Sequence, residues 1–154
     1  TMLDMSGNKL SGTIPAEIGN MRKLNLLSLA YNKLQGEVPA DLGWLSELEE
    51  LNVARNELEG ILPAEWGELK NLKRLTLTGN KFRGSIPKAW EGMKKLEYFW
   101  GQDNALTGKV PDFLFRLPVL KRLCLENNFL QLTEEQKKLD RKGEQYFLLP
   151  QGEK

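Results

Sequence analysis

The sequence predicts an α/β solenoid in which short parallel strands line a concave face and 3-10 or short helical turns line a convex face. The first observation is a column of asparagines that recurs every 24 residues without a slip: Asn8, Asn32, Asn56, Asn80, Asn104 and Asn128. The second is that proline, glycine and leucine columns keep the same period, beginning at Pro15, Gly12 and Leu24. Registered columns at a fixed period of this length indicate a stacked repeat array.

The strand of each repeat is predicted from alternating apolar residues, as in Leu27-Ser28-Leu29. Successive strand residues point to opposite faces, so the two leucines should be buried and Ser28 should face outward. Stacked repeats can then share one core, because each repeat alone cannot bury its apolar face. The sheet should be parallel, with one strand from each repeat.

The asparagine after each strand is predicted to point inward. Its side-chain amide offers both donors and an acceptor, and it can bond backbone groups of its own and the adjacent turn that would otherwise be buried without partners. The six asparagines should therefore form a structural ladder.

Glycine and proline of the L-x-G-x-I/V/L-P segment follow the asparagine. Glycine allows the backbone of neighbouring turns to approach closely, and proline has a φ suited to starting a short helical turn. Trp66 and Trp90 occupy the position held by Ile18, Leu42 and Leu114 in other repeats. We interpret both tryptophans as core residues, with a binding role as the alternative.

The fifth repeat departs from the pattern. Gly101 stands where other repeats carry Leu29, Val53, Leu77 or Leu125, and Phe99 stands at the first buried strand position. Either the aromatic ring fills the volume that the glycine vacates, or the strand contains a local bulge.

The repeat pattern stops after Asn128. Thr133-Glu134-Glu135-Gln136 has the form of a capping box that opens a helix, with Gly143 as its stop, and residues 146–150 form an apolar patch without repeat register. We therefore predict a solenoid of six repeats over residues 1–130, the first one truncated, and a C-terminal cap with a short helix and a tail over 131–154. Because no N-terminal cap is visible, the chain is expected to belong to a longer protein or to an assembly.

The period from residue 24 to residue 48 reads LNLLSLAYNKLQGEVPADLGWLSEL. It resembles the plant-type leucine-rich repeat, whose unit is LxxLxLxxNxLxGxIPxxLGxLxx, and the resemblance covers residues 1 to about 130. It implies a right-handed superhelix whose role is macromolecular recognition.

Size and charge restrict the class of partner. A chain of 154 residues with 40% hydrophobic content can form one continuous core. A net charge of +1 lacks the basic excess that drives nucleic-acid binding. The longest apolar stretch, residues 113–120, is interrupted and is shorter than the roughly 20 residues of a membrane span, so neither nucleic acid nor a membrane-spanning helix is expected.

Charge is nevertheless uneven along the chain. Arg55 is the one basic residue between positions 37 and 68, a stretch that contains Glu37, Asp41, Glu47, Glu49, Glu50, Glu57, Glu59, Glu65 and Glu68. A basic block over residues 70–95 follows it. Two interpretations stay open: solvated faces with ion pairs between repeats, or a binding partner with a polarised surface.

Cysteine usage and the N-terminus bear on the compartment. Cys124 is the sole cysteine, and the chain contains no Asn-x-Ser/Thr sequon. Both observations favour a reducing, non-glycosylating compartment, intracellular or organellar, over an extracellular one. Residues 1–4 lack the basic and apolar regions of a secretory signal, so either the chain is not secreted or its N-terminus is missing.

Residues for catalysis are not apparent. The chain has no histidine, so the usual general base and the commonest transition-metal ligand are missing. No glycine-rich phosphate-binding motif occurs, and Cys124 has no evident activating base. We therefore expect no enzyme activity, no cofactor and no metal site.

The register predicts which side chains face outward from the concave sheet. The predicted partner-binding residues are Glu50, Asn52, Arg55, Arg74, Thr76, Tyr98, Trp100, Gln102, Asp103, Arg122 and Glu126. The small residues Ser28, Ala30, Ala54 and Thr78 fall in the same outward columns. Tyr98 and Trp100 beside Arg74 and Arg122 have the composition of an interface hot spot, and the alternative is that the aromatics shield the irregular fifth repeat.

The first functional hypothesis is a protein-interaction module that binds a protein partner on the concave or lateral face. The second is a fragment of a cell-surface recognition ectodomain or secreted inhibitor, similar to plant receptor kinases and polygalacturonase inhibitors, which would bind a peptide, a glycan or a glycosidase.

Overall fold

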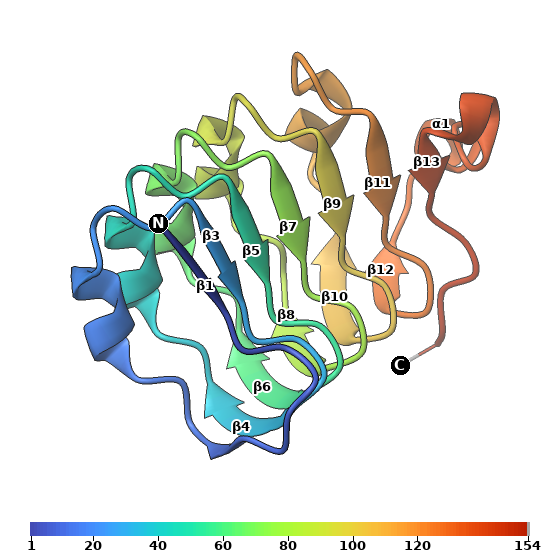
Figure 1. Ribbon diagram of the computed structural model, residues 1–154. Helices are drawn as coiled ribbons and strands as arrows, with labels where there is room; N and C mark the ends of the chain where they lie inside the picture. Colours follow the sequence, from blue (N-terminus) through green and yellow to red (C-terminus); the bar gives the residue numbers. More distant parts are fainter. Residues whose placement is uncertain (154) are drawn as a thin grey trace.

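The computed structural model describes residues 1–153 and shows a curved solenoid with two parallel sheets and a row of 3-10 helices (Figure 1). Within these residues the concave sheet has seven strands in the order β1-β3-β5-β7-β9-β11-β13. Their bounds are β1 Met2–Asp4, β3 Leu26–Ser28, β5 Glu50–Asn52, β7 Arg74–Thr76, β9 Tyr98–Trp100, β11 Arg122–Cys124 and β13 Tyr146–Phe147. The predicted α/β solenoid with one short parallel strand per repeat is confirmed.

A second parallel sheet, which the sequence analysis did not predict, lies after the asparagine of each repeat. Its described strands are β2 Ser11–Gly12, β4 Lys33–Glu37, β6 Glu57–Ile61, β8 Lys81–Gly84, β10 Ala105–Lys109 and β12 Phe129–Gln131. In β6, Leu58 is buried while Glu57 and Glu59 are exposed, as expected for a strand with one face on the core. Gly60 adopts φ 82°, a left-handed conformation that glycine adopts without steric cost.

The convex side carries one 3-10 helix in each of five consecutive repeats: η1 Ala16–Asn20, η2 Ala40–Trp44, η3 Ala64–Glu68, η4 Lys88–Gly92 and η5 Asp112–Arg116. Each follows a proline, and the five prolines have φ between −64° and −74°. Helices η1, η2 and η3 stack closely on the next repeat because Gly19, Gly43 and Gly67 each face its backbone. A Cβ atom on Gly43 would collide with the backbone carbonyl of Glu65.

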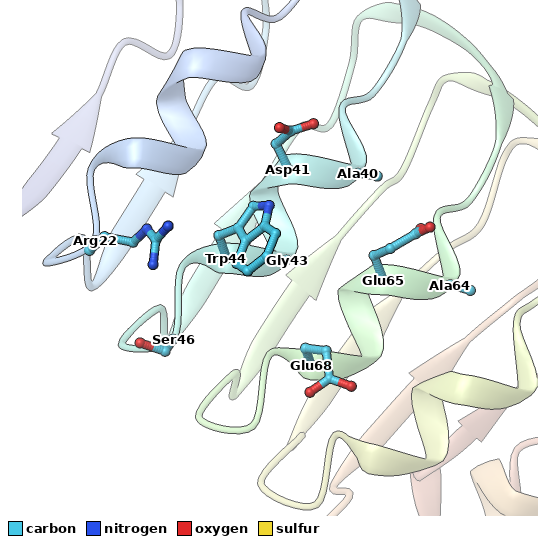
Figure 2. Close-up of a pocket in the computed structure, with 9 residues that line it drawn as sticks. All are labelled: Arg22, Ala40, Asp41, Gly43, Trp44, Ser46, Ala64, Glu65 and Glu68. Carbon is cyan, nitrogen blue, oxygen red and sulfur yellow. The ribbon is translucent and has the colours of Figure 1, made fainter.

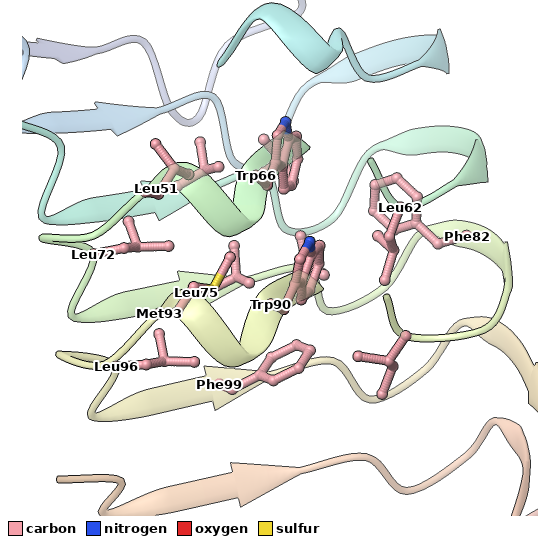
Figure 3. Close-up of a cluster of buried hydrophobic side chains, with 14 of the residues drawn as sticks. Leu51, Leu62, Trp66, Leu72, Leu75, Phe82, Trp90, Met93, Leu96 and Phe99 are labelled. Carbon is pink, nitrogen blue, oxygen red and sulfur yellow. The ribbon is translucent and has the colours of Figure 1, made fainter. Parts of the chain in front are cut away.

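Trp66 and Trp90 are core residues, as predicted. They are 0% and 1% exposed, and their rings stack at 6.1 Å between centroids (Figure 3). Each indole Nε1–H donates to the proline carbonyl of the preceding repeat, at 3.1 Å from Trp66 to Pro39 and 2.8 Å from Trp90 to Pro63. The buried polar atom of each indole therefore has a partner.

In the fifth repeat, the Phe99 ring fills the volume that Gly101 leaves empty. Phe99 is fully buried, and a Cβ atom on Gly101 would lie 3.1 Å from Phe99 Cε1 and 3.2 Å from Leu125 Cδ2. Strand β9 pairs in unbroken register with β7 and β11, which rules out a bulge in this strand.

The asparagine side chains bond backbone groups of two successive repeats. Asn56 Nδ2 donates to the carbonyl of Leu29 in the preceding repeat (3.0 Å) and to that of Val53 in its own (3.1 Å), while Asn56 Oδ1 accepts from the amide of Leu34 (3.0 Å). Equivalent bonds surround Asn32, Asn80, Asn104 and Asn128. Asn8 is exposed and donates to Met5 and Ser6 of its own turn.

Helix α1 begins as predicted and ends earlier. The Thr133 hydroxyl accepts from the Gln136 amide (3.1 Å) and the Gln136 side chain accepts from the Thr133 amide (3.0 Å), which completes the capping box. The helix spans only Glu134–Lys137, and a separate 3-10 turn, η6, covers Lys142–Glu144. Gln136 Nε2 also donates to the carbonyl of Val110 (3.1 Å), so α1 is docked on the last repeats.

The expectation that residues 146–150 lie outside the repeat register is wrong. Strand β13 continues the concave sheet, with Tyr146 opposite Leu123, and Leu148 is fully buried. Gln151 takes the place of a ladder asparagine: its Oε1 accepts from the Leu130 amide (2.9 Å), and its Nε2 donates to the carbonyl of Leu125 (2.7 Å). The segment therefore forms a seventh turn, while the predicted boundary between solenoid and cap near residue 130 stays a prediction.

Candidate partner-binding surface

The predicted binding residues fall into adjacent columns of the concave sheet. Glu50, Arg74, Tyr98 and Arg122 are direct neighbours at the first positions of β5, β7, β9 and β11. Asn52, Thr76 and Trp100 are neighbours at the third positions. Both columns are accessible from the concave side, since all these side chains are half-buried or exposed.

An aromatic pair lies at the centre of these columns. The rings of Tyr98 and Trp100 are stacked, with centroids 5.1 Å apart and planes 7° from parallel. The Arg74 guanidinium lies 5.5 Å from the Tyr98 ring centroid, within the range of a cation–π interaction. The two rings and the guanidinium thus support one another by contact, and side chains held in this way lose less entropy on binding.

A second cation–π cluster adjoins the first and was missed by the sequence analysis. The guanidinium groups of Arg122 and Arg141 lie 5.3 and 5.4 Å from the ring centroid of Phe147. Phe147 comes from β13, beside β11. It could have been found from the sequence only by recognising that residues 146–151 repeat the strand-and-amide pattern at a shorter spacing.

Small residues in the outward columns are buried, contrary to the expectation that these columns face solvent. Ala30, Ala54 and Thr78 are 2%, 6% and 8% exposed, and Ser28 is 8% exposed. On a concave sheet, short side chains are covered by the longer ones of neighbouring strands. These four residues are therefore not part of the accessible surface.

Gln102 and Glu126 occupy the same column in successive repeats, and both have a buried Oε1 atom without a hydrogen-bond partner among the described residues. Burial raises the pKa of the Glu126 carboxyl, and nearby Asp103 adds to this rise, while a backbone hydrogen bond and Arg141 oppose it. Glu126 is therefore an acid with one poorly solvated carboxylate oxygen on the concave face.

One rim of the sheet connects alternate repeats. The guanidinium of Arg55 lies 3.9 Å from the carboxylate of Asp103, two repeats away. Between them stands Gly79 at φ 72°, where a Cβ atom would lie 2.7 Å from Arg55 Cδ. Asn127 Nδ2 donates to the other Asp103 oxygen (2.8 Å). The predicted binding residues Arg55 and Asp103 therefore form a long ion pair with each other, without a hydrogen bond between them.

Ion pairs between repeats line the opposite rim. Lys73 Nζ lies 2.8 Å from Glu49, and Lys121 Nζ lies 2.8 Å from Glu97. The hydrogen bond from Lys73 lowers the pKa of the Glu49 carboxyl. Among the described ion pairs, Glu49 is the one acid of residues 37–68 that takes part, so both interpretations of the uneven charge stay open.

Cys124 is buried in the concave sheet. Burial raises the pKa of its thiol to about 11, and Glu126 adds to the effect while Arg122 opposes it. The thiol is therefore protonated at neutral pH, which makes it a poor nucleophile.

Two structural findings concern other classes of site. In the described chain, none of the helices has the length and apolar character needed to cross a membrane. Among residues 1–153, groups of three or more Cys, Asp and Glu side chains placed to hold a metal ion are absent.

Together, the fold and the accessible columns define a repeat solenoid with an ordered aromatic and arginine patch on its concave sheet. The family model described as Leucine Rich Repeat matches residues 1–21, 47–69 and 71–93. No match is found among curated proteins.

Solved structures extend the similarity. The chain is 40% identical, over 84% of its length, to the ectodomain of the Arabidopsis thaliana receptor kinase GASSHO1/SCHENGEN3 in complex with CASPARIAN STRIP INTEGRITY FACTOR 2, with a TM-score of 0.82. It is 36% identical over 84% to a chain of the PEPR1-AtPEP1 structure, with a TM-score of 0.82. It is 30% identical over 85% to a chain of the Arabidopsis thaliana BIR3-SERK2 complex, with a TM-score of 0.70.

The chain belongs to the leucine-rich repeat family, in its plant-type form. It spans 16% and 18% of the first two of these structures and 68% of the third.

Proposed function

We propose that the chain is a protein-interaction module that binds a partner segment on its concave sheet, without catalysing a reaction. The observation that carries the proposal is the ordered stack of Arg74, Tyr98 and Trp100. Aromatic and arginine side chains held at the centre of a surface account for most of the energy of many protein interfaces.

The charge around the stack indicates the chemistry of the partner. Arg74 is exposed, and Arg122, which pairs with Tyr98 in the sheet, lies with Arg141 near the ring of Phe147. Guanidinium groups form paired hydrogen bonds with carboxylates. A segment that carries an acidic side chain beside an apolar one would engage both the arginines and the rings.

The similar structures support the same kind of recognition. GASSHO1/SCHENGEN3 is in complex with CASPARIAN STRIP INTEGRITY FACTOR 2, and BIR3 is in complex with SERK2. We extend from these proteins to the present chain only the principle that such a solenoid binds another polypeptide.

A random-peptide phage library selected on the immobilised chain tests the proposal. Peptides enriched on the unaltered chain should bind Trp100→Ala/Arg74→Ala about 1000-fold more weakly, because two hot-spot residues each contribute about 2 kcal/mol and every 1.4 kcal/mol is a factor of ten. The control is Tyr31→Ala/Lys33→Ala, which removes an exposed aromatic and a cation from the second repeat.

Binding that survives the Trp100/Arg74 change would place the interface elsewhere. A large fall in melting temperature of that variant would instead assign the two side chains to packing of the fifth repeat. Circular dichroism during heating separates the two results.

A second candidate is a fragment of a cell-surface recognition ectodomain with a peptide ligand, which the receptor ectodomains among the similar structures favour. Surface biotinylation of intact cells distinguishes the two candidates. Labelling of the native protein supports the ectodomain, and protection from the reagent until the cells are lysed supports the intracellular module.

A further inference from the structure

A groove of about 650 Å³ lies on the convex side, away from the concave stack, between the 3-10 helices η2 and η3. Its lining includes Arg22, Trp44, Glu65 and Glu68 (Figure 2). None of these residues was identified as a site residue from the sequence.

Trp44 is the apolar anchor of this groove. Its side chain is 60% exposed, whereas Trp66 and Trp90 are buried in the core. The equivalent positions of the other repeats hold Asn20, Glu68, Gly92 and Arg116. A large exposed indole at a position that is otherwise polar or small contributes little to the core, and exposed aromatics of this kind are enriched at binding surfaces.

The Trp44 ring already accepts one cation. The Arg22 guanidinium lies 5.3 Å from its centroid, and Figure 2 shows Trp44 between Arg22 on one side and Glu65 and Glu68 on the other. The ring therefore faces two carboxylates across the groove.

The groove floor is formed by small residues. Ala40, Gly43 and Ala64 line it, and Gly43 allows η2 to pack directly against the backbone of Glu65. No large side chain fills the space between the two helices, so an extended side chain from outside can enter it.

The charge around the groove is unbalanced. Asp41, Glu65 and Glu68 line it against Arg22 alone. Within residues 1–153, none of these three carboxylates lies within 4.0 Å of a basic nitrogen. A cationic group that enters the groove would meet unpaired acceptors.

We propose that this groove is a docking site for a basic segment of a partner protein, in which an arginine side chain stacks on Trp44 and donates hydrogen bonds to Glu65 or Glu68. Arginine fits better than lysine because its planar guanidinium stacks on an indole and also forms paired bonds with a carboxylate. The site is separate from the concave stack and does not depend on the function proposed for it.

The test is a nuclear magnetic resonance titration of the full, ¹⁵N-labelled chain. The probe is a capped peptide, Gly-Ser-Arg-Gly-Arg-Ser-Gly. It should shift the Trp44 indole and the amides of Ala40 and Ala64 in a saturable manner. The indoles of Trp66 and Trp90, which are bonded to proline carbonyls, serve as internal references.

Two sets of variants define the chemistry. Glu65→Gln/Glu68→Gln should weaken peptide binding about tenfold or more, because the guanidinium then donates to neutral amide oxygens and loses its ion pair with a carboxylate. Glu57→Gln/Glu91→Gln removes the same charge from exposed positions outside the groove and should leave binding unchanged. In Trp44→Leu, binding is followed by the amide signals of Ala40 and Ala64. This variant should bind the arginine peptide no more tightly than the same peptide with lysine in place of arginine.

Several outcomes would overturn the proposal. One is a Trp44 indole signal that the arginine peptide does not shift. Another is an equal shift of this signal by the peptide with glutamate in place of arginine, or by a neutral chitin hexasaccharide. A Trp44 shift that depends on the concentration of the chain alone, with dimer formation in sedimentation, would make a second copy the occupant and reject the basic partner.

Discussion

The middle and the end of the amide ladder perform the same task in different surroundings. Asn56 is buried and bonds backbone groups of its own and the preceding turn, whereas Gln151 is half-buried and makes the corresponding bonds at the described end of the array. Asn8, at the opposite end, is exposed and bonds only its own turn in the described structure. The comparison teaches that a rung stabilises the fold according to how far water is excluded from the backbone groups that it satisfies.

The largest effect is expected in the middle of the ladder. Asn56→Ala should lower the free energy of unfolding by about 1–3 kcal/mol, because the Leu34 amide and the carbonyls of Leu29 and Val53 lose a buried partner. Urea denaturation measures the loss. Asn8→Ala is the matched control and should cost much less, so equal losses would break the comparison.

A smaller effect is expected at the end. Gln151→Ala should cost about 1 kcal/mol, since water can reach part of the site that Gln151 bonds. Amide hydrogen exchange at Leu130 should accelerate more than exchange at Leu58. Gln151→Asn sharpens the comparison, because it keeps the amide on a shorter side chain. If the Leu130 amide were as protected from exchange in this variant as in the parent chain, the length of glutamine would not be needed here.

The smallest effect concerns Glu126, whose column neighbour in the fifth repeat is the neutral Gln102. Burial raises the folded-state pKa of Glu126, so its contribution to stability is complete below the unfolded pKa and is lost as pH rises through the folded value. Glu126→Gln should therefore be more stable than the parent chain at pH 7. The difference should vanish as pH falls below about 4, where the carboxyl is protonated in both states.

Thermal melts of both chains across this pH range provide the measurement. A constant difference at every pH would mean that the substitution acts through packing and not through charge. A less stable variant at pH 7 would show that the Glu126 carboxylate is solvated in the folded chain.

The sequence was sufficient to predict what the 24-residue period controls. Leu51, Leu75 and Trp90 are in the core because their columns are apolar in every repeat, and Phe99 compensates for Gly101 within a single strand. The second parallel sheet escaped prediction because its strands read as a glycine-containing loop, and pairing arises only when successive repeats stack.

The site was predictable only in part. The outward positions of Arg74, Tyr98 and Trp100 follow from the strand register. The stacking of their side chains on one another became apparent only in the structure. Phe147 was missed because the seventh turn does not keep the repeat pattern. Its amide residue is a glutamine, Gln151, and lies at a shorter spacing from Asn128 than the asparagines of the ladder do from one another. Trp44 was missed because a residue at an exposed position leaves no periodic signal in the sequence.

The contact from Arg55 over Gly79 to Asp103 has a consequence for cooperativity. A repeat array is usually described as a one-dimensional chain in which each unit couples only to its neighbours. This ion pair joins the third repeat to the fifth, which adds a coupling between second neighbours. Exposed pairs of this kind contribute up to about 1 kcal/mol, and the fourth repeat cannot unfold locally without stretching or breaking this one. Local opening of the fourth repeat should therefore cost up to about 1 kcal/mol more than coupling to its immediate neighbours alone would require.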